Sequence, residues 1–170
     1  MGKRAKGQDG TPAETEGREA TPTVTVPTVT ADARLLARGV CRLLTALGYA
    51  SLTEFTLRSG RRADVMAIEP GGQTLIVEIK SSIEDFRSDH KWPEYLDFCD
   101  LFYFAVPEGF PRALIPEDCG LMVADAYEAT ILRDSPHAKI NAARRRSLTL
   151  RFGMTAAQRL AQLTDPHDGQ

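Results

Sequence analysis

Three charged residues between Arg61 and Ser82 have the types and the spacing of a hydrolytic site. Asp64 precedes a turn, and Glu78 and Lys80 follow it, separated by one apolar residue, Ile79. Carboxylate and carbonyl oxygens are the ligands that Mg²⁺ prefers. A metal ion beside a lysine ammonium suits phosphodiester hydrolysis, in which a water attacks and negative charge develops. We therefore predict Asp64, Glu78 and the Ile79 carbonyl as metal ligands and Lys80 as a catalytic residue.

The segment RRADVMAIEPGGQTLIVEIKSS is typical of two strands joined by a tight turn. Side chains two positions apart on a strand share a face, so Glu78 and Lys80 point the same way. Asp64 stands opposite Glu78 or Lys80 only if the loop around Gly71–Gly72 has an odd number of residues. An even loop would place Asp64 opposite Ile79 instead. We expect the odd loop.

A simpler interpretation of the Glu-x-Lys pattern is a solvated strand face or a surface ion pair. Two features favour a site instead. Asp64 lies on the neighbouring strand, after a glycine turn, and the positions between the charged residues are apolar. Two carboxylates on one half-buried face repel each other, and a divalent cation removes that repulsion.

The elements around this pair predict a mixed sheet flanked by helices. A helix is expected over residues 31–47, with Thr30 as its N-cap, followed by strands near 52–58, 63–69 and 74–80. Helical composition follows, with Pro93 expected to begin a second helix, and then the wholly apolar strand LFYFAV. The three consecutive strands favour an antiparallel meander, and the helical crossover allows a parallel fourth strand.

Two further short strands are predicted in LMVAD and EATIL, and helix from about Ser135 to the end. Residues 1–27 are rich in Gly, Thr, Pro and charged residues, so we expect a disordered tail, with residues 28–166 forming a single domain. The net charge of −2 confines any nucleic-acid surface to a local patch. No apolar run of about 18 residues and no secretory signal is visible, which predicts a cytoplasmic protein without membrane partners.

Asp64 followed by Glu78-Ile79-Lys80 resembles the D…(D/E)xK signature of the PD-(D/E)xK nuclease superfamily. Longer stretches, including DHKWPEYLDFCD and GLMVADAYEATILRD, resemble the MmcB-related DNA repair proteins. The resemblance covers most of the chain beyond Ala31. It implies a restriction-endonuclease-like αβββαβ core within about 31–106, extended by C-terminal strands and helices.

The resemblance also implies a function, namely a Mg²⁺-dependent DNA nuclease acting in DNA repair, with Mn²⁺ able to substitute. Two departures from the superfamily pattern stand out. Ala63 occupies the position of the signature proline, and the first helix lacks a central acidic residue. A three-residue loop at Arg58–Gly60 would place Glu54 opposite Asp64 as a further metal ligand. A surface salt bridge between Glu54 and an arginine is the alternative.

Two other functional hypotheses stay open at this stage. The fold could serve as a catalytically weak module that binds DNA or a repair partner, or the chain could be an unrelated α/β domain with a surface ion pair. DNA is the expected partner, other repair proteins are further candidates, and a homo-oligomer is compatible with the sequence.

Phosphate contacts are expected from basic and hydroxyl side chains around the predicted site. The candidates are Arg61, Arg62, Ser81 and Lys91. Tyr95 is a candidate accessory residue, with packing against the sheet as the alternative. The basic run Arg144–Arg146 is either a DNA-facing patch or a solvated face. We assign Asp85 and Asp89 to a solvated helix face.

Overall fold

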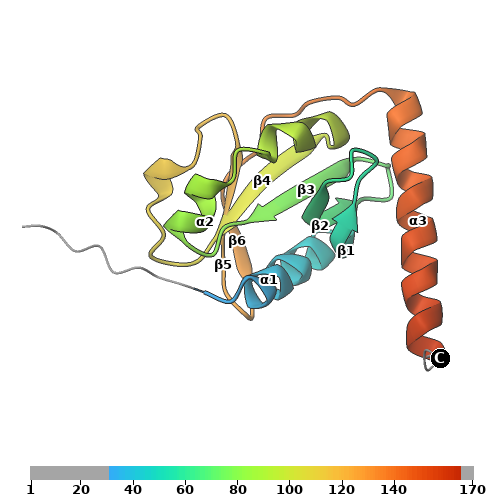
Figure 1. The fold of residues 1–170 in the computed structure, drawn as a ribbon, viewed down its shortest axis with the longest axis horizontal. Coiled ribbons are helices and arrows are strands. Elements are labelled where there is room, and N and C mark those ends of the chain that lie inside the picture. The colour runs from blue at the N-terminus through green and yellow to red at the C-terminus, as the bar shows by residue number, and fades with distance from the viewer. Residues whose placement is uncertain (1–30, 166–170) are drawn as a thin grey trace, which may run out of the picture.

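The structure is a computed structural model that describes residues 31–165, so the predicted N-terminal tail lies outside the described residues. Six strands form one mixed sheet in the order β1-β2-β3-β4-β5-β6, with helices on both faces (Figure 1). The predicted α/β fold with a mixed sheet flanked by helices is confirmed.

All six predicted strands are present, and the first three pair as predicted. Their bounds are β1 Ala50–Thr56, β2 Arg62–Ile68, β3 Thr74–Ile79, β4 Leu101–Val106, β5 Gly120–Ala124 and β6 Ala129–Arg133. The first three form the antiparallel meander, and β4 joins β3 in parallel. Beyond the αβββαβ core, β5 is parallel to β4, and β6 is antiparallel to β5. All strand residues of β3 are buried, as expected for a central strand covered on both faces.

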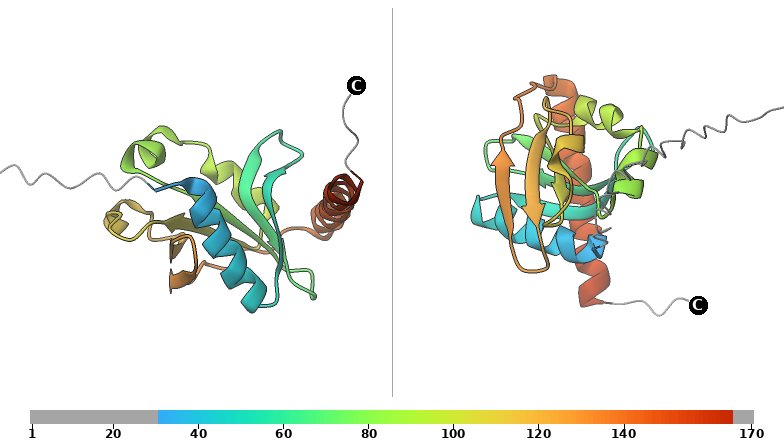
Figure 2. Two further views of the ribbon diagram at one scale, coloured as in Figure 1. Left: turned by 90° about the horizontal axis from the view of Figure 1, so that it is seen from below. Right: turned by 90° about the vertical axis from the view of Figure 1, so that its left-hand side faces the viewer.

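Helix α1 (Ala33–Ala46) covers one face of the sheet, and the short helix α2 (Ile83–Ser88) and the 3₁₀ helix η1 (Trp92–Phe98) lie on the other (Figure 2). The N-cap of α1 is Asp32, whose carboxylate accepts the Arg34 N–H at 2.9 Å, and not Thr30. A second short 3₁₀ helix, η2, spans Arg112–Leu114. The predicted second helix is therefore present as η1, with Pro93 in its first turn.

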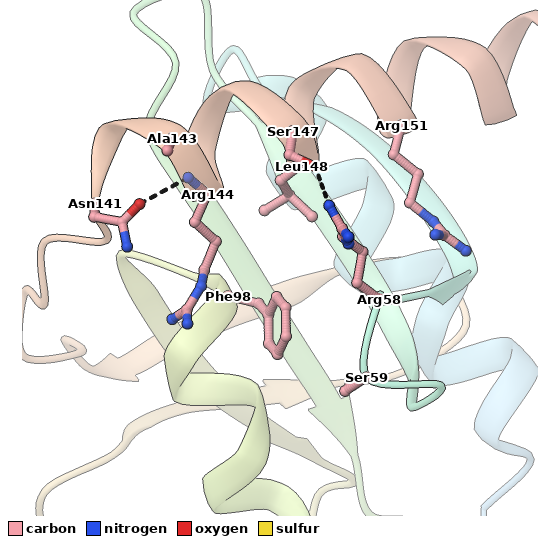
Figure 3. Close-up of a pocket in the computed structure, with 9 residues that line it drawn as sticks. All are labelled: Arg58, Ser59, Phe98, Asn141, Ala143, Arg144, Ser147, Leu148 and Arg151. Carbon is pink, nitrogen blue, oxygen red and sulfur yellow. Dashed lines mark hydrogen bonds between the residues drawn. The ribbon is translucent and has the colours of Figure 1, made fainter.

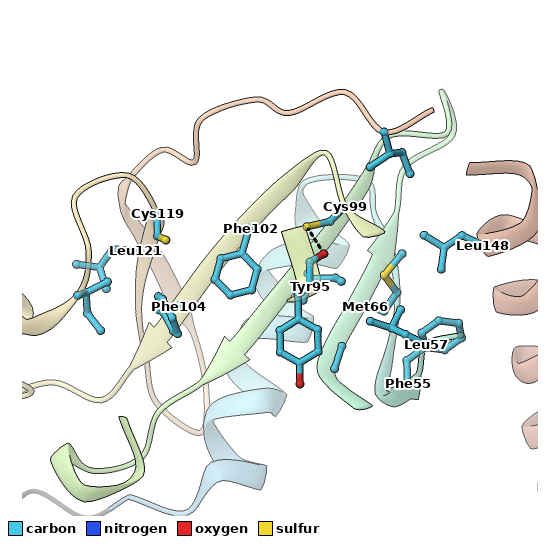
Figure 4. Packing of buried hydrophobic residues seen from close by; sticks show 14 of the residues in the cluster. Phe55, Leu57, Met66, Tyr95, Cys99, Phe102, Phe104, Cys119, Leu121 and Leu148 are labelled. Atoms are coloured by element: carbon cyan, nitrogen blue, oxygen red, sulfur yellow. Dashed lines mark hydrogen bonds between the residues drawn. The ribbon is translucent and has the colours of Figure 1, made fainter. Parts of the chain in front are cut away.

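The two faces of the sheet build two apolar cores. Val65 and Val77 pack under α1, whereas Met66 and Ile76 belong to the aromatic core on the η1 side. Figure 4 shows this aromatic core, with Met66 among its labelled residues. Ala63 lies two positions before Val65 and would share its face on a regular strand, but it lies in the aromatic core instead.

The exception at Ala63 has a backbone cause. Glu54, in the neighbouring strand, has a positive φ of 51°, which is rare for a residue other than glycine. Leu52 and Phe55, on either side of it, both pack against the aromatic core although they are three positions apart. The alternation of side chains along β1 is therefore interrupted at Glu54, and Ala63, the partner of Phe55, lies on the same face as Phe55.

Helix α3 (Ala142–Thr164) begins later than the sequence predicts. Residues 134–141 form no helix, because Pro136 interrupts it and the Asn141 side chain caps α3 by accepting the Arg144 N–H at 2.8 Å. The helix docks through Leu148 and Phe152, which are buried. Within residues 31–165, no helix combines the length and the apolar character that a membrane span requires.

Candidate active site

The turn between β2 and β3 has the predicted odd length. Val65 pairs with Val77 and Ile68 with Thr74, which leaves five residues, 69–73, in the loop. This register places Asp64 directly across from Glu78. The prediction that a loop of odd length brings these two residues opposite each other is confirmed.

Asp64 lies at the point where β2 and β3 stop pairing. Its Oδ2 atom accepts the backbone N–H of Ile79 at 2.8 Å, in place of a backbone carbonyl of β2. The next N–H, that of Lys80, is donated to the other side, to the Ala105 carbonyl at 2.9 Å. Since the N–H and C=O groups of one strand residue point to the same neighbour, the Ile79 carbonyl also points toward β2. The Asp64 carboxylate and the Ile79 carbonyl therefore share one strand end.

Glu78 is a buried carboxyl with an incomplete set of partners. Only 7% of the residue is exposed. Its Oε1 atom lies 3.3 Å from Lys80 Nζ, and Oε2 is buried without a hydrogen-bond partner. Burial, and next the charge of Asp64, raise the pKa of Glu78 to about 8. Burial also raises the pKa of Asp64, against the opposing effect of the Ile79 N–H. The surroundings therefore disfavour the state in which Asp64 and Glu78 are both ionised.

This raised pKa predicts how stability depends on pH. A carboxyl whose pKa is higher in the folded protein binds a proton preferentially in the folded state, so rising pH destabilises the fold between the ordinary value of 4.5 and about 8. Glu78→Gln removes this penalty. We expect the variant to gain stability relative to the parent as the pH rises from about 4.5 to about 8, by up to about 5 kcal/mol.

Urea denaturation in the presence of EDTA measures this difference in the free energy of unfolding. The exposed Glu84 of α2, changed to Gln, is the matched control. A difference between Glu78→Gln and the parent that stays constant with pH would contradict the buried, proton-binding state of Glu78.

Lys80 is held by two carboxylates. It is 3% exposed, and its Nζ donates to Asp89 Oδ2 at 2.6 Å and to Glu78 Oε1. Burial lowers the pKa of Lys80, but the hydrogen bond to Asp89 and the charge of Glu78 outweigh it, and the pKa is raised. The side chain is therefore a stable ammonium.

Asp89 is a candidate site residue that the sequence analysis assigned to a solvated helix face. It directly follows α2, and the fold brings its carboxylate to Lys80. Burial raises the pKa of Asp89, but its hydrogen bonds from Lys80 and the Lys91 N–H lower it below the usual range. Asp85, also assigned to a solvated face, accepts the Ser81 N–H at 3.1 Å. The pattern Ser82-x-x-Asp85 could have indicated Asp85 as a capping residue at the start of α2, since Asp85 donates its N–H to Ser82 Oγ. No periodic signal marks Asp89, because its contact depends on how α2 folds against β3.

The predicted phosphate-binding residues have varied surroundings. Arg61 makes a two-pronged ion pair with Glu94, at 2.8 and 2.7 Å. Lys91 is exposed, and Ser81 is half-buried beside Asp85. The guanidinium of Arg61 is therefore engaged within the protein, and the Lys91 side chain is open to a ligand.

Glu54 and Tyr95 follow the alternatives that the sequence left open. Glu54 lies across from Asp64, because the residues on either side of it pair with Val65 and Ala63. Its carboxylate forms an ion pair with Arg62 at 2.5 Å, which is the surface salt bridge given as the alternative. Tyr95 is buried in the aromatic core, and its hydroxyl donates to the Arg62 carbonyl at 3.0 Å. Tyr95 thus packs under the sheet and fixes the start of β2.

A cleft of about 670 Å³ opens between α1 and strands β1 and β2. Asp64 and Ile79 line it, while Glu78 and Lys80 lie behind them. Three arginines reach the same cleft, Arg62 from β2 and Arg34 and Arg38 from α1. The sequence analysis did not select Arg34 and Arg38, although their spacing of four places them on one helical face. The cleft combines positive charge with access to the carboxylates.

The donor atoms at this strand end are all oxygens, which are the ligands that a hard divalent cation prefers. Among residues 31–165, no group of three or more His, Cys, Asp or Glu side chains is arranged to hold a metal ion. The chain offers two carboxylates, Asp64 and Glu78, and the Ile79 carbonyl. Mg²⁺ is commonly bound through one or two carboxylates while it keeps several waters, so this small set is compatible with it. The unpartnered Oε2 of Glu78 is the atom that most needs such a cation.

Comparison with known proteins identifies the family. Residues 21–167 match the family described as "DNA repair protein MmcB-like". The chain belongs to this MmcB-like family. Family membership supports a role in DNA repair and, with it, interaction with DNA.

A solved structure shares the MmcB-like fold described above. It is a protein of unknown function from Silicibacter pomeroyi, 45% identical in sequence, with a TM-score of 0.77. The match covers 81% of this chain and 94% of the other. A search among curated proteins gives no match.

Proposed function

We propose that this MmcB-like protein is a metal-dependent DNA nuclease that acts in DNA repair by phosphodiester hydrolysis. The observation that carries the proposal is the buried Glu78 carboxyl, with one oxygen unpartnered and with Asp64 opposite it. A buried, unpaired carboxylate is destabilising. A cation bound in the working complex gives a reason for keeping it. The arrangement is also compatible with the PD-(D/E)xK superfamily.

Asp64, Glu78 and the Ile79 carbonyl would hold the cation, with Mg²⁺ as the expected metal and Mn²⁺ as a substitute. A bound divalent cation supplies Lewis-acid stabilisation of the phosphate and a nucleophilic water near neutral pH. Asp64 lines the cleft and is directly accessible to a cation there, whereas Glu78 lies behind Asp64, away from the cleft surface. Their raised pKa values fall when a positive charge lies between them.

Lys80 acts in this proposal through its charge. Its raised pKa keeps the ammonium protonated, so it stabilises negative charge on the phosphate or orients a water by donating a hydrogen bond. Asp89 positions it from the opposite side. Lys80 is therefore not the proton acceptor of the resting protein.

A second candidate function is DNA binding without cleavage. Two observations favour it, namely the absence of a three-carboxylate metal group among the described residues and the engagement of Lys80 by Asp89. One experiment separates the two functions. The parent protein is incubated with duplex, single-stranded, flapped and branched DNA in Mg²⁺, Mn²⁺ or EDTA. The nuclease predicts cleavage that EDTA abolishes, and the binding module predicts retention of DNA without cleavage under any of these conditions.

The arginines of the cleft give a separate prediction about binding. Arg34 and Arg38 are exposed, and their side chains have no acidic partner among the described residues. We expect Arg34→Gln with Arg38→Gln to weaken duplex binding and to reduce the slope of log K against log salt by about 1.8, since each phosphate contact contributes about 0.9. Arg42→Gln, on the same helix but outside the cleft, is the control.

Fluorescence anisotropy in EDTA at several salt concentrations measures this slope without cleavage. An unchanged slope in the double variant would mean that Arg34 and Arg38 do not contact DNA phosphates and that DNA binds elsewhere on the surface. Changing Arg61 and Arg62 to Ala tests whether these two residues, next to the cleft, also contribute to DNA binding. We expect Arg61 to change the salt slope less than a cleft arginine does, because Glu94 already neutralises its charge.

A further inference from the structure

A second hollow lies between α3, η1 and the turn that joins β1 to β2 (Figure 3). Its volume is about 540 Å³, within the range of small-molecule sites. No residue that lines it also lines the cleft of the candidate active site. It is a separate feature of the surface, and nothing in the proposed chemistry uses it.

Two arginines that have no acidic partner among the described residues lie at this hollow. Arg58 comes from the β1–β2 turn and Arg151 from α3, and both are exposed. The side-chain contact of Arg58 is a long hydrogen bond of 3.4 Å to Ser147 Oγ. No ion pair or hydrogen bond is found for the Arg151 guanidinium within residues 31–165. Guanidinium groups bind phosphate oxygens through paired N–H donors, so the hollow suits a phosphate-bearing ligand.

An aromatic ring lies between these charges. Phe98 is half-buried and points into the hollow between Arg144 and Arg58 (Figure 3). Arg144 lies 5.3 Å from the ring centroid, fixed by its hydrogen bond to the Asp97 carbonyl at 2.6 Å. The buried Leu148 adds an apolar wall. A partly exposed ring beside cations that have no acidic partner among the described residues is a combination that suits the bases and phosphates of single-stranded nucleic acid.

We infer that this hollow binds one unpaired nucleotide of a DNA strand. The phosphate lies against Arg58 and Arg151, and the base packs on Phe98. A base within a duplex is covered by its stacked neighbours, so only an unpaired base can reach the ring. The inference rests on the proposed function in one respect, namely that DNA is the ligand, and it adds the substrate class: DNA with a single-stranded segment.

One strand is able to occupy the hollow and the candidate active site together. Arg58 precedes Asp64 by six residues, so their backbones lie at most about 20 Å apart. Nucleotides stacked at about 3.4 Å each cover that distance in about six positions. The hollow would then hold the unpaired end of a substrate while its backbone passes the cleft.

The charge part of the inference is tested with Arg58→Gln combined with Arg151→Gln. Binding of a labelled single-stranded oligonucleotide to the full chain is followed by fluorescence anisotropy in EDTA. We expect the slope of log K against log salt to fall by about 1.4, since each contact to a single strand contributes about 0.7. Arg146→Gln is the matched control, because Arg146 is exposed on the same helix and does not line the hollow.

The aromatic part is tested with Phe98→Leu, which keeps an apolar side chain but removes the ring. We expect the Kd for the single-stranded oligonucleotide to rise about tenfold and the Kd for a blunt duplex to stay unchanged. A melting curve of the variant establishes that the fold is retained.

Three outcomes would overturn the inference: an equal loss in Arg146→Gln, an equal loss for duplex DNA, or an unchanged single-strand Kd in Phe98→Leu. Because binding is measured in EDTA, it is independent of catalysis. Weakened single-strand binding in the hollow variants, with a parent that never cleaves, supports the hollow and rejects the nuclease. Metal-dependent cleavage by the parent, with unchanged single-strand binding in the hollow variants, supports the nuclease and rejects the hollow as a binding site.

Discussion

Glu78→Gln and Asp64→Asn should each lower Mg²⁺-dependent DNA cleavage by at least about 100-fold while leaving the fold intact. Each change removes one negative charge from the pair that would hold the metal and preserves the shape of the side chain. Asn at position 64 is still able to accept the Ile79 N–H. Gln at position 78 removes a buried charge that has one unpartnered oxygen, so we expect an unchanged or higher melting temperature.

Lys80→Ala should also abolish cleavage, but with a different effect on stability. Lys80 is buried between Asp89 and Glu78, and its removal leaves the Asp89 carboxylate without its cation. Breaking a buried pair in this way is worth about 3–5 kcal/mol. From the sequence alone, Lys80→Ala would be expected to leave the melting temperature nearly unchanged. The contact between Lys80 and Asp89 changes that expectation.

Cleavage and melting temperature are measured on the same preparations, with Glu84→Gln as the control. Glu84 is an exposed acidic residue of α2, so its change should affect neither quantity. A parent without metal-dependent cleavage, together with strong destabilisation by Glu78→Gln, would mean that Glu78 and Lys80 form a structural ion pair. In that case the nuclease proposal fails.

Asp100→Asn should produce the largest loss of stability away from the candidate site, about 3–5 kcal/mol. Asp100 is 1% exposed, and its Oδ2 accepts the N–H and the hydroxyl of Thr74 at 2.8 and 2.9 Å. Arg145 adds two hydrogen bonds, at 2.6 and 2.7 Å. Burial raises the pKa of Asp100, but these donors outweigh it and hold the pKa far below its usual range.

The reason for this large effect is that Asp100 joins three parts of the fold. It contacts Thr74 at the start of β3, Arg145 in α3 and the N–H of Ile140 in the preceding segment. An amide at this position cannot neutralise Arg145 and places an N–H₂ group where the carboxylate accepts hydrogen bonds. The docking of α3 then weakens together with the start of β3.

Urea denaturation at neutral pH measures the change, and Arg144→Gln provides a matched comparison. Arg144 is the neighbour of Arg145, but its ion pair with Asp97 is exposed and 3.5 Å long, so its loss should be below about 1 kcal/mol. Equal effects of the two substitutions would show that burial of Asp100 contributes little.

The sequence by itself determined the register of the candidate site. Strand periodicity and the length of one turn are local properties. They put Glu78 and Lys80 on one face and predicted Asp64 opposite Glu78 or Lys80, of which the structure shows Glu78. The apolar run Leu101–Val106 likewise predicted a buried strand, and the helical segment before it allowed the parallel position beside β3 that this strand takes. In each case the information lies within a few neighbouring residues, where covalent geometry leaves few alternatives.

The partners of these side chains were decided only by the tertiary structure. Asp89 reaches Lys80 because α2 folds back over β3, and Glu94 reaches Arg61 because η1 packs beside the β1–β2 turn. The basic run of α3 separates in the same way, with the half-buried Arg145 paired with the buried Asp100 and Arg146 exposed. Such pairings depend on how helices dock on a sheet. That docking is fixed by the packing of two cores assembled from the whole chain, and no local pattern of charges records it.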